Sequence, residues 1–160
     1  MYIELAKLSD LDEIMAIYQG AITYMKANGN PNQWIDGYPG ESVVVNDINS
    51  DHLYVCKNDD EIVAVFCYFV GDEPTYSEIY DGAWSCDNEY GVVHRIASNG
   101  SVKRVADYCL EWCFAKHPHM RIDTHSDNVT MQNVLERCGY EKCGIIKCSN
   151  GSLRIAYQKF

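Results

Sequence analysis

The turn that follows a β-type segment at residues 90–97 has the composition of an anion-binding turn. Gly100 and Ser101 break the segment, and Lys103 and Arg104 add positive charge to a chain that is otherwise acidic. A helix that begins near Ser101 would expose unpaired N–H groups and the positive end of its dipole, which together can hold a pyrophosphate. Any turn from a strand into a helix also needs Gly and Ser, and the glycine patterns of dinucleotide-binding and P-loop proteins are both missing.

A second group of polar residues lies on the β-type segment 121–125. Because side chains alternate along a strand, Arg121, Asp123 and His125 are expected on one face and the residues between them on the other. Polar side chains that fill one face of an inner strand indicate that this face lines a cleft. Asn128 follows, and its simplest role is to cap the next helix.

Hydrophobic periodicity predicts the elements that position these residues. Strands are expected at residues 2–8, 53–57, 61–70, 90–97, 121–125, 143–148 and 153–159, and a further piece of strand within 76–83. Helices are expected after a Ser9 cap, around 41–49, from about Ser101, and after Asn128 up to a left-handed Gly139. This order predicts an α/β fold with a mixed sheet flanked by helices. No linker or repeat divides the chain, so we expect a single domain over residues 1–160.

Composition and charge exclude several classes of function. The chain has 160 residues, 13 Lys and Arg against 23 Asp and Glu, and a net charge of −10. A protein that grips nucleic acid needs clustered basic residues, so we expect no nucleic-acid partner. The longest apolar run, residues 62–70, is far shorter than the about 20 residues of a membrane span. The acidic N-terminal segment does not resemble a secretion signal, and we expect a cytoplasmic protein without a membrane partner.

Eight cysteines are many for a cytoplasmic chain, but they form no recognisable metal or disulfide pattern. They lie mostly inside apolar segments, and no C-x-x-C occurs. The nearest approach to a metal pattern is Cys109, Cys113 and His117 at helical spacing, which Pro118 interrupts before His119. We therefore expect buried free thiols, which behave as small apolar side chains, and no metal site.

Over essentially its whole length, the chain resembles the GNAT N-acetyltransferase superfamily. The resemblance lies in the N-terminal strand and helix and in the order of elements. It also lies in the stretches DEIVAVFCYFV, YGVVHRIASNGSVKRVADYCLEWCF and RIDTHSDNVTMQNVLERCGYEKCGII. It implies an acyl-CoA N-acyltransferase fold with a mixed, mostly antiparallel sheet, and acetyl-CoA as the cofactor.

The resemblance also implies how acetyl-CoA binds. The family's pyrophosphate loop usually reads Arg/Gln-x-x-Gly-x-Gly/Ala, whereas this chain has SVKRVA at residues 101–106, with Arg104 where Gly is normal. Backbone N–H groups would hold the phosphates, helped by the charges of Lys103 and Arg104, and the pantetheine arm would bind the main chain of the fourth long strand. The cofactor-binding residues that the resemblance implies are Ile96, Ala97, Ser98, Ser101, Val102, Lys103, Arg104, Val105, Ala106 and Asn128.

Acetyl transfer to an amine requires a neutral nucleophile, a polarised thioester carbonyl and a protonated leaving thiol. Histidine is the side chain whose ordinary pKa lies closest to neutrality. The candidate bases are therefore His94, expected on the same strand face as Ile96 and Ser98, and His125, with Asp123 as orienting or amine-binding charge. Family members often carry a proton-donating Tyr in the helix after the Asn, but Leu135 stands there in this chain. The proton donor is therefore another group or solvent.

An aromatic and acidic cluster completes the candidate site. Carboxylates beside aromatic rings suit a cationic amine, and the substrate-binding candidates are Trp34, Tyr38, Glu73, Tyr80 and Trp84. Ordinary packing within the loops explains the same residues equally well. A homodimer interface is a third use, because exposed aromatic side chains also mark protein contacts.

The function that we expect is acetyl-CoA-dependent N-acetylation of an amine on a small molecule, a peptide N-terminus or a lysine, by direct transfer in a ternary complex. The alternative is a catalytically reduced acyl-CoA-binding or regulatory module, which Leu135 and the altered loop favour. Acetyl-CoA should raise the melting temperature in both cases, but only the enzyme releases free CoA when amines are added.

Overall fold

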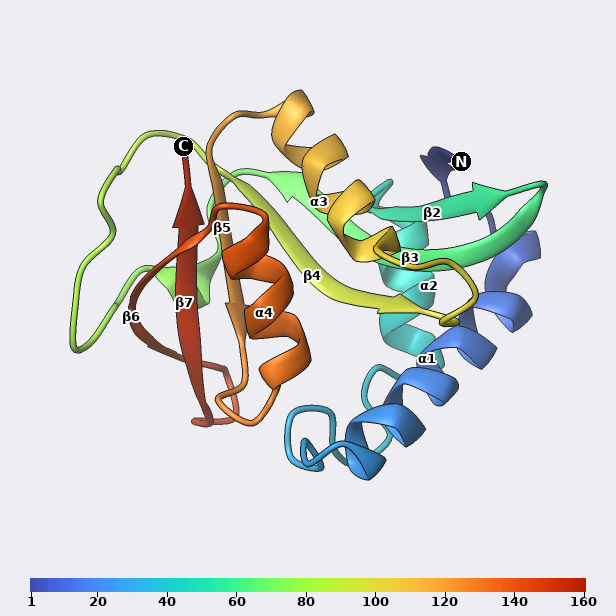
Figure 1. The fold of residues 1–160 in the computed structure, drawn as a ribbon, viewed down its shortest axis with the longest axis horizontal. Coiled ribbons are helices and arrows are strands. Elements are labelled where there is room, and N and C mark those ends of the chain that lie inside the picture. The colour runs from blue at the N-terminus through green and yellow to red at the C-terminus, as the bar shows by residue number, and fades with distance from the viewer.

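In the computed structural model, which describes all of residues 1–160, seven strands form one mixed sheet in the order β1-β2-β3-β4-β5-β7-β6 (Figure 1). The strands are β1 Tyr2–Leu5, β2 Leu53–Asn58, β3 Glu61–Val70, β4 Gly91–Ser98, β5 Met120–Thr124, β6 Glu141–Lys147 and β7 Leu153–Lys159. The helices are α1 Leu11–Ala27, α2 Glu41–Asn49, α3 Val105–Lys116 and α4 Val129–Arg137. The expected fold class, an α/β fold with a mostly antiparallel sheet, is confirmed.

The pairing between β4 and β5 stops soon after it starts. These two strands are the only parallel neighbours, and they pair at Gly91 with Met120 and at Val92 with Arg121 alone. From there β5 pairs with β7 over its full length, while β4 continues to Ser98 beside β3. The second half of β4 therefore has no strand neighbour on the side of β5, and its main-chain groups are free on that edge.

A β-bulge bends β4 where its pairing with β5 has ended. Arg95 has a left-handed backbone (φ 52°), and the register with β3 shifts between Val65 and Cys67. The extra residue reverses the alternation of side chains. Ile96 packs against the cluster under α3 and α4, whereas Ala97 belongs to the cluster under α1 and α2. The prediction that His94 shares a face with Ile96 was therefore wrong, because a regular strand had been assumed.

The helices cover both faces of the sheet. α3 and α4 lie in front of it in Figure 1 and bury Val105, Leu110 and Leu135 in one cluster. α1 and α2 pack on the opposite face, where Ile14 and Val44 are fully buried. None of these helices combines the length and the apolar character that crossing a bilayer requires.

Three local predictions were wrong in detail. Ser9 lies in a 3-10 turn, where Asp10 accepts a hydrogen bond from the Lys7 N–H (2.8 Å), and α1 starts after this turn. Helix α3 begins four residues later than expected, at Val105. Residues 76–83 form no strand: a 3-10 turn, Pro74–Tyr76, is followed by a single bridge from Tyr80 to β6.

All eight cysteines are free, and five of them are buried.

Candidate active site

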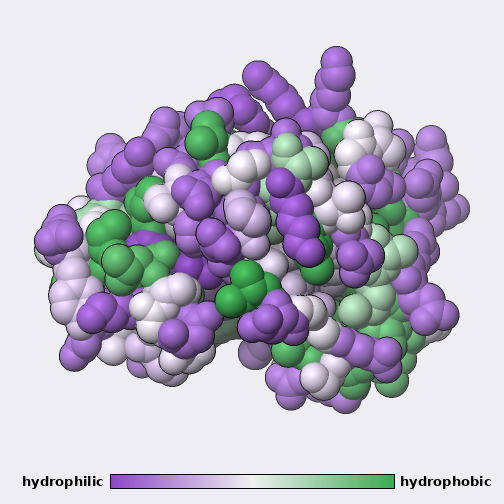
Figure 2. Space-filling view, turned by 90° about the horizontal axis from the view of Figure 1, so that it is seen from below, coloured by the Kyte–Doolittle hydropathy of each residue, from purple (hydrophilic) through white to green (hydrophobic).

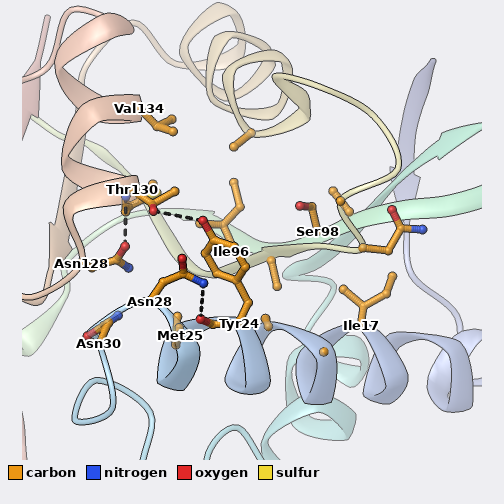
Figure 3. A pocket seen from close by; sticks show the side chains of 18 of the residues that line it. Ile17, Tyr24, Met25, Asn28, Asn30, Ile96, Ser98, Asn128, Thr130 and Val134 are labelled. Atoms are coloured by element: carbon orange, nitrogen blue, oxygen red, sulfur yellow. Dashed lines mark hydrogen bonds between the residues drawn. The ribbon is translucent and has the colours of Figure 1, made fainter.

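A cavity of about 760 Å³ opens beside the free edge of β4. Its walls are α1, the second half of β4 and the first turn of α4 (Figure 3). Tyr24 of α1 reaches across to α4, where its hydroxyl lies 3.4 Å from that of Thr130. At the other wall, Asn128 caps α4 by accepting from the Met131 N–H (3.0 Å). We call this the first cavity.

The free edge of β4 offers hydrogen-bond donors to the first cavity. The Asn99 N–H donates to Val63 on β3 (3.0 Å). Because donors alternate between the two edges of a strand, the N–H groups of Ser98 and Ile96 point to the other edge, which no strand covers. A ligand with amide or carbonyl groups can therefore continue the sheet at this position.

The first cavity contains half of the residues predicted to bind the cofactor. Ile96, Ala97, Ser98, Ala106 and Asn128 line it, together with Asn99 and Gly100. Ser101, Val102, Lys103, Arg104 and Val105 lie beyond its edge. Val105 is buried in the core, and Lys103 and Arg104 are exposed at the start of α3.

A second cavity, of about 790 Å³, adjoins the first. Met25, Ile96, Asn128 and Met131 line both cavities, so the two meet at the point where β4 and β5 part. Its other walls come from the loops 28–40 and 71–90, from β5 and from the turn between β6 and β7. Of the predicted residues, it contains Trp34, Tyr38, Glu73, His94 and Asp123.

His94 lies between two carboxylates in the second cavity. Its Nε2 is 3.0 Å from Oε2 of Glu73, and its Nδ1 is 3.9 Å from Oδ2 of Asp123. The hydrogen bond with His94 lowers the pKa of Glu73 to about 2, against the opposing effect of burial. Asp123 accepts a hydrogen bond from the buried hydroxyl of Tyr76 (2.7 Å). Burial and the neighbouring Asp123 raise the pKa of Tyr76, so that its proton stays in place. The imidazole is thus oriented by a carboxylate that is ionised at neutral pH.

Replacement of Glu73 with glutamine is expected to make the protein less sensitive to acid. The Glu73 pKa lies at about 2 in the folded protein and at its ordinary 4.5 in the unfolded chain. The carboxylate therefore stabilises the fold above about pH 4.5, and this stabilisation, up to about 3 kcal/mol, is lost as the pH falls toward 2. Urea unfolding of both proteins over this range measures the difference. Parallel pH curves would contradict it.

The other predicted residues of the site lie outside both cavities. His125 accepts a hydrogen bond at Nδ1 from the Asp127 N–H (3.0 Å), just after β5. Tyr80 is exposed and donates to Glu78 (2.8 Å). Trp84 packs on Tyr76, the residue that donates to Asp123, and its own indole N–H donates to the Tyr76 carbonyl (2.9 Å). No group of three or more His, Cys, Asp or Glu side chains is arranged to hold a metal ion.

Comparison with known proteins assigns this arrangement. The family model described as "Acetyltransferase (GNAT) family" matches residues 14–140. This range includes β4, which borders both cavities, and its bulge at Arg95. The chain belongs to the GNAT acetyltransferase family. A GNAT acetyltransferase of Streptococcus agalactiae is 33% identical, with a TM-score of 0.91 over 99% of this chain and 94% of that one. The family assignment confirms the resemblance seen in the sequence.

Solved structures of lower sequence identity share the fold. A putative acetyltransferase of Staphylococcus aureus is 23% identical, with a TM-score of 0.73 over 99% of this chain and 98% of that one. A ribosomal-protein-alanine N-acetyltransferase of Brucella melitensis is 16% identical, with a TM-score of 0.63 over 100% and 99%. No curated protein sequence matches the chain. The chain therefore has the fold of an acetyltransferase, and its membership of the GNAT family implies acetyl transfer that depends on acyl-CoA.

In the loop before α3, the residue that departs from the GNAT pattern, Arg104, has a strained backbone. Arg104, the residue before α3, has φ 59° and ψ 25°, a left-handed conformation that favours glycine. Its side chain is exposed, outside the first cavity. The backbone at this position thus has a conformation that glycine adopts without strain, although the residue is an arginine.

Replacement of Arg104 with glycine is expected to raise the free energy of unfolding by about 1 kcal/mol, because the left-handed strain disappears. The melting temperature should rise by about 2–4 °C in thermal unfolding. Lys103→Gly is the matched control, since Lys103 is also exposed but lies outside the positive-φ region. Equal effects of the two substitutions would contradict the role of strain.

The sequence did not point to the hydroxyls of this GNAT site. Leu135 lies on α4 and is fully buried, and its side chain carries no proton donor. The hydroxyls that line the first cavity belong to Tyr24, Ser98 and Thr130. Tyr24 was seen in the sequence only as part of a helix, and its side chain reaches the cavity because α1 crosses beside the free edge of β4.

Proposed function

We propose that this GNAT protein is an active N-acetyltransferase that moves the acetyl group of acetyl-CoA directly to an amine in a ternary complex. The observation that carries the proposal is the early end of the β4–β5 pairing, where two cavities meet. One cavity offers free strand N–H groups and the other offers a histidine between carboxylates. Donor and acceptor can therefore be held at the same time, with their reacting atoms at the junction.

His94 is proposed as the general base. An amine is protonated at neutral pH and must lose a proton before it attacks the thioester. The carboxylates of Glu73 and Asp123 attract the cationic amine, and the His94 imidazole accepts its proton while Glu73 stabilises the imidazolium that results. The alternative base, His125, lies outside both cavities.

Residues of the first cavity are proposed to hold acetyl-CoA. The unpaired N–H groups of Ile96 and Ser98 suit the amides and the thioester carbonyl of this donor, and donation to that carbonyl would stabilise the negative charge that develops on its oxygen. Tyr24 and Thr130 supply hydroxyls that can protonate the departing thiolate. The exposed Lys103 and Arg104 lie beyond the cavity and can contribute charge to the pyrophosphate.

Two measurements test the proposal. Acetyl-CoA should raise the melting temperature, and free CoA should be released when a panel of small amines and peptides is added. A thermal shift without any release would instead support the acyl-CoA-binding or regulatory module, which the buried Leu135 and the altered loop favour. No shift with saturating CoA would exclude both functions.

The surroundings of the protein are proposed on separate grounds. The eight free cysteines favour a cytoplasmic location, because disulfides are typical of oxidising compartments. The net charge disfavours a nucleic-acid partner. The face of Figure 2 is mostly hydrophilic, with hydrophobic residues in separate patches. Homodimer formation through exposed aromatic side chains is tested by sedimentation of the purified protein.

A further inference from the structure

Arg154 of β7 is a buried cation that lines the second cavity without an acidic partner. Its exposed fraction is 7%. Nη1 donates to the Ser152 hydroxyl (2.9 Å) and to the Leu153 carbonyl (3.0 Å), and Nη2 donates to the Gln33 carbonyl (3.1 Å). Nε makes no hydrogen bond within the chain. All partners of this guanidinium are therefore neutral.

The other arginines inside the protein are compensated differently. Arg95 forms two hydrogen bonds with Asp47 (2.8 and 2.9 Å). Arg121 lies between the rings of Trp84 and Tyr90, 4.2 Å from each centroid, and pairs with Asp87. Removing a charge from water is costly unless an opposite charge compensates it. Arg154 is left with a charge that a ligand of the cavity can compensate.

Acidic groups dominate the rest of the second cavity. Asp36, Asp72, Glu73 and Asp123 line it without an arginine or lysine partner. Arg154 projects from the strand that pairs with β5, two residues before Ala156, which is the register partner of Asp123. Two residues along a strand span about 7 Å, and residues two apart share a face. Arg95 also lines this cavity but is paired with Asp47, so Arg154 is the arginine of the cavity that has no acidic partner.

We propose that the amine acceptor also carries a carboxylate, and that Arg154 binds this carboxylate while the carboxylates of Glu73 and Asp123, which flank His94, receive the amine. The acceptor class is therefore an amino acid or a similar amino carboxylate. This inference rests on the proposed acetyl transfer and narrows its substrate. An arginine fork matches a carboxylate with two parallel hydrogen bonds, which fixes the orientation of the acceptor as well as its charge.

A purely structural role for Arg154 makes a different prediction. Its three hydrogen bonds connect the turn between β6 and β7 with the loop after α1, and their loss would lower stability equally with every acceptor. Carboxylate binding instead changes the preference between acceptors. The ratio of kcat/KM for two substrates on one protein cancels general damage and isolates this preference.

The test compares α-amino acids, β-alanine and 4-aminobutyrate with the corresponding amines that lack the carboxylate. CoA release gives kcat/KM for each pair, and thermal shift of the CoA-loaded protein gives binding independently of turnover. We expect the best amino carboxylate to be preferred about 10²-fold by the native protein and the preference to fall to near unity in Arg154→Gln. Arg154→Lys should restore part of it. Arg137→Gln, at an arginine that pairs with Asp107 away from both cavities, should leave it unchanged.

The outcomes separate the two proposals. Acetylation of amines without a carboxylate preference, or a preference that survives in Arg154→Gln, overturns the role of Arg154 and leaves acetyl transfer standing. A thermal shift by amino carboxylates that depends on Arg154, without CoA release, supports the ligand class and overturns the transferase.

Discussion

Replacement of His94 with glutamine is expected to lower kcat for acetyl transfer at least 100-fold. A positioned general base contributes about 10²–10⁴-fold, and glutamine keeps hydrogen-bonding capacity but cannot accept a proton at neutral pH. The KM for acetyl-CoA should change little, because His94 lies in the second cavity and outside the first. Steady-state kinetics of CoA release measures both constants.

His125→Gln is the matched control for this prediction. His125 carries the same chemical group, only a few residues from Asp123, but lines neither cavity. The substitution should leave kcat within about twofold, as is usual for positions away from the reacting atoms. A large loss in His125→Gln together with normal activity in His94→Gln would move the base to the other histidine.

Replacement of Gly20 with phenylalanine is expected to abolish the thermal shift by acetyl-CoA and to reduce affinity at least 100-fold. Gly20 lies in the middle of α1 and lines the first cavity, and a Cβ added there meets no atom within 4 Å. A large side chain can therefore grow into the cavity without displacing the core. Because glycine is the poorest ordinary helix former, the variant should be no less stable than the native protein. Isothermal titration with CoA measures the affinity.

Gly20→Ala separates occupancy of the cavity from the change in helix propensity. Alanine should raise the free energy of unfolding by about 0.5–1 kcal/mol and preserve CoA binding, because a single methyl group occupies little of the cavity. If Gly20→Phe still bound CoA with native affinity, the first cavity would not be the donor site.

Periodicity predicted the elements of the sheet well wherever the backbone is regular. The segments 41–49, 61–70 and 153–159 were predicted with the bounds that the structure has, since their apolar spacing is uninterrupted. The bulge at Arg95 escaped prediction, because the two following residues are as apolar as those of a regular strand. The late start of α3 at Val105 has a similar cause: the stripe of apolar residues extends into the loop.

The candidate site was predicted where a residue's chemistry was conspicuous. His94, Asp123 and Glu73, far apart in the sequence, line one cavity, although their roles remain proposals. Tyr80 and Trp84 looked similar to Trp34 in the sequence, but loop packing, which has no periodic signal, directs them elsewhere. Arg154 was not singled out, because a polar residue in an alternating strand ordinarily faces solvent. Its burial became visible only in three dimensions.

Hydrogen bonds from α1, from α2 and from the loop before α2 hold the bulge of β4 in place. The Tyr18 hydroxyl of α1 donates to the Arg95 carbonyl (2.9 Å), and the Arg95 guanidinium donates to Asp47 of α2 and to the Tyr38 hydroxyl (2.9 Å). Tyr38 and Asp47 line the second cavity, whereas the N–H of Ile96, the residue after Arg95, points to the uncovered edge of β4 beside the first cavity. The Arg95 peptide, held from α1, from α2 and from the loop before α2, is therefore a fixed partition between the two cavities.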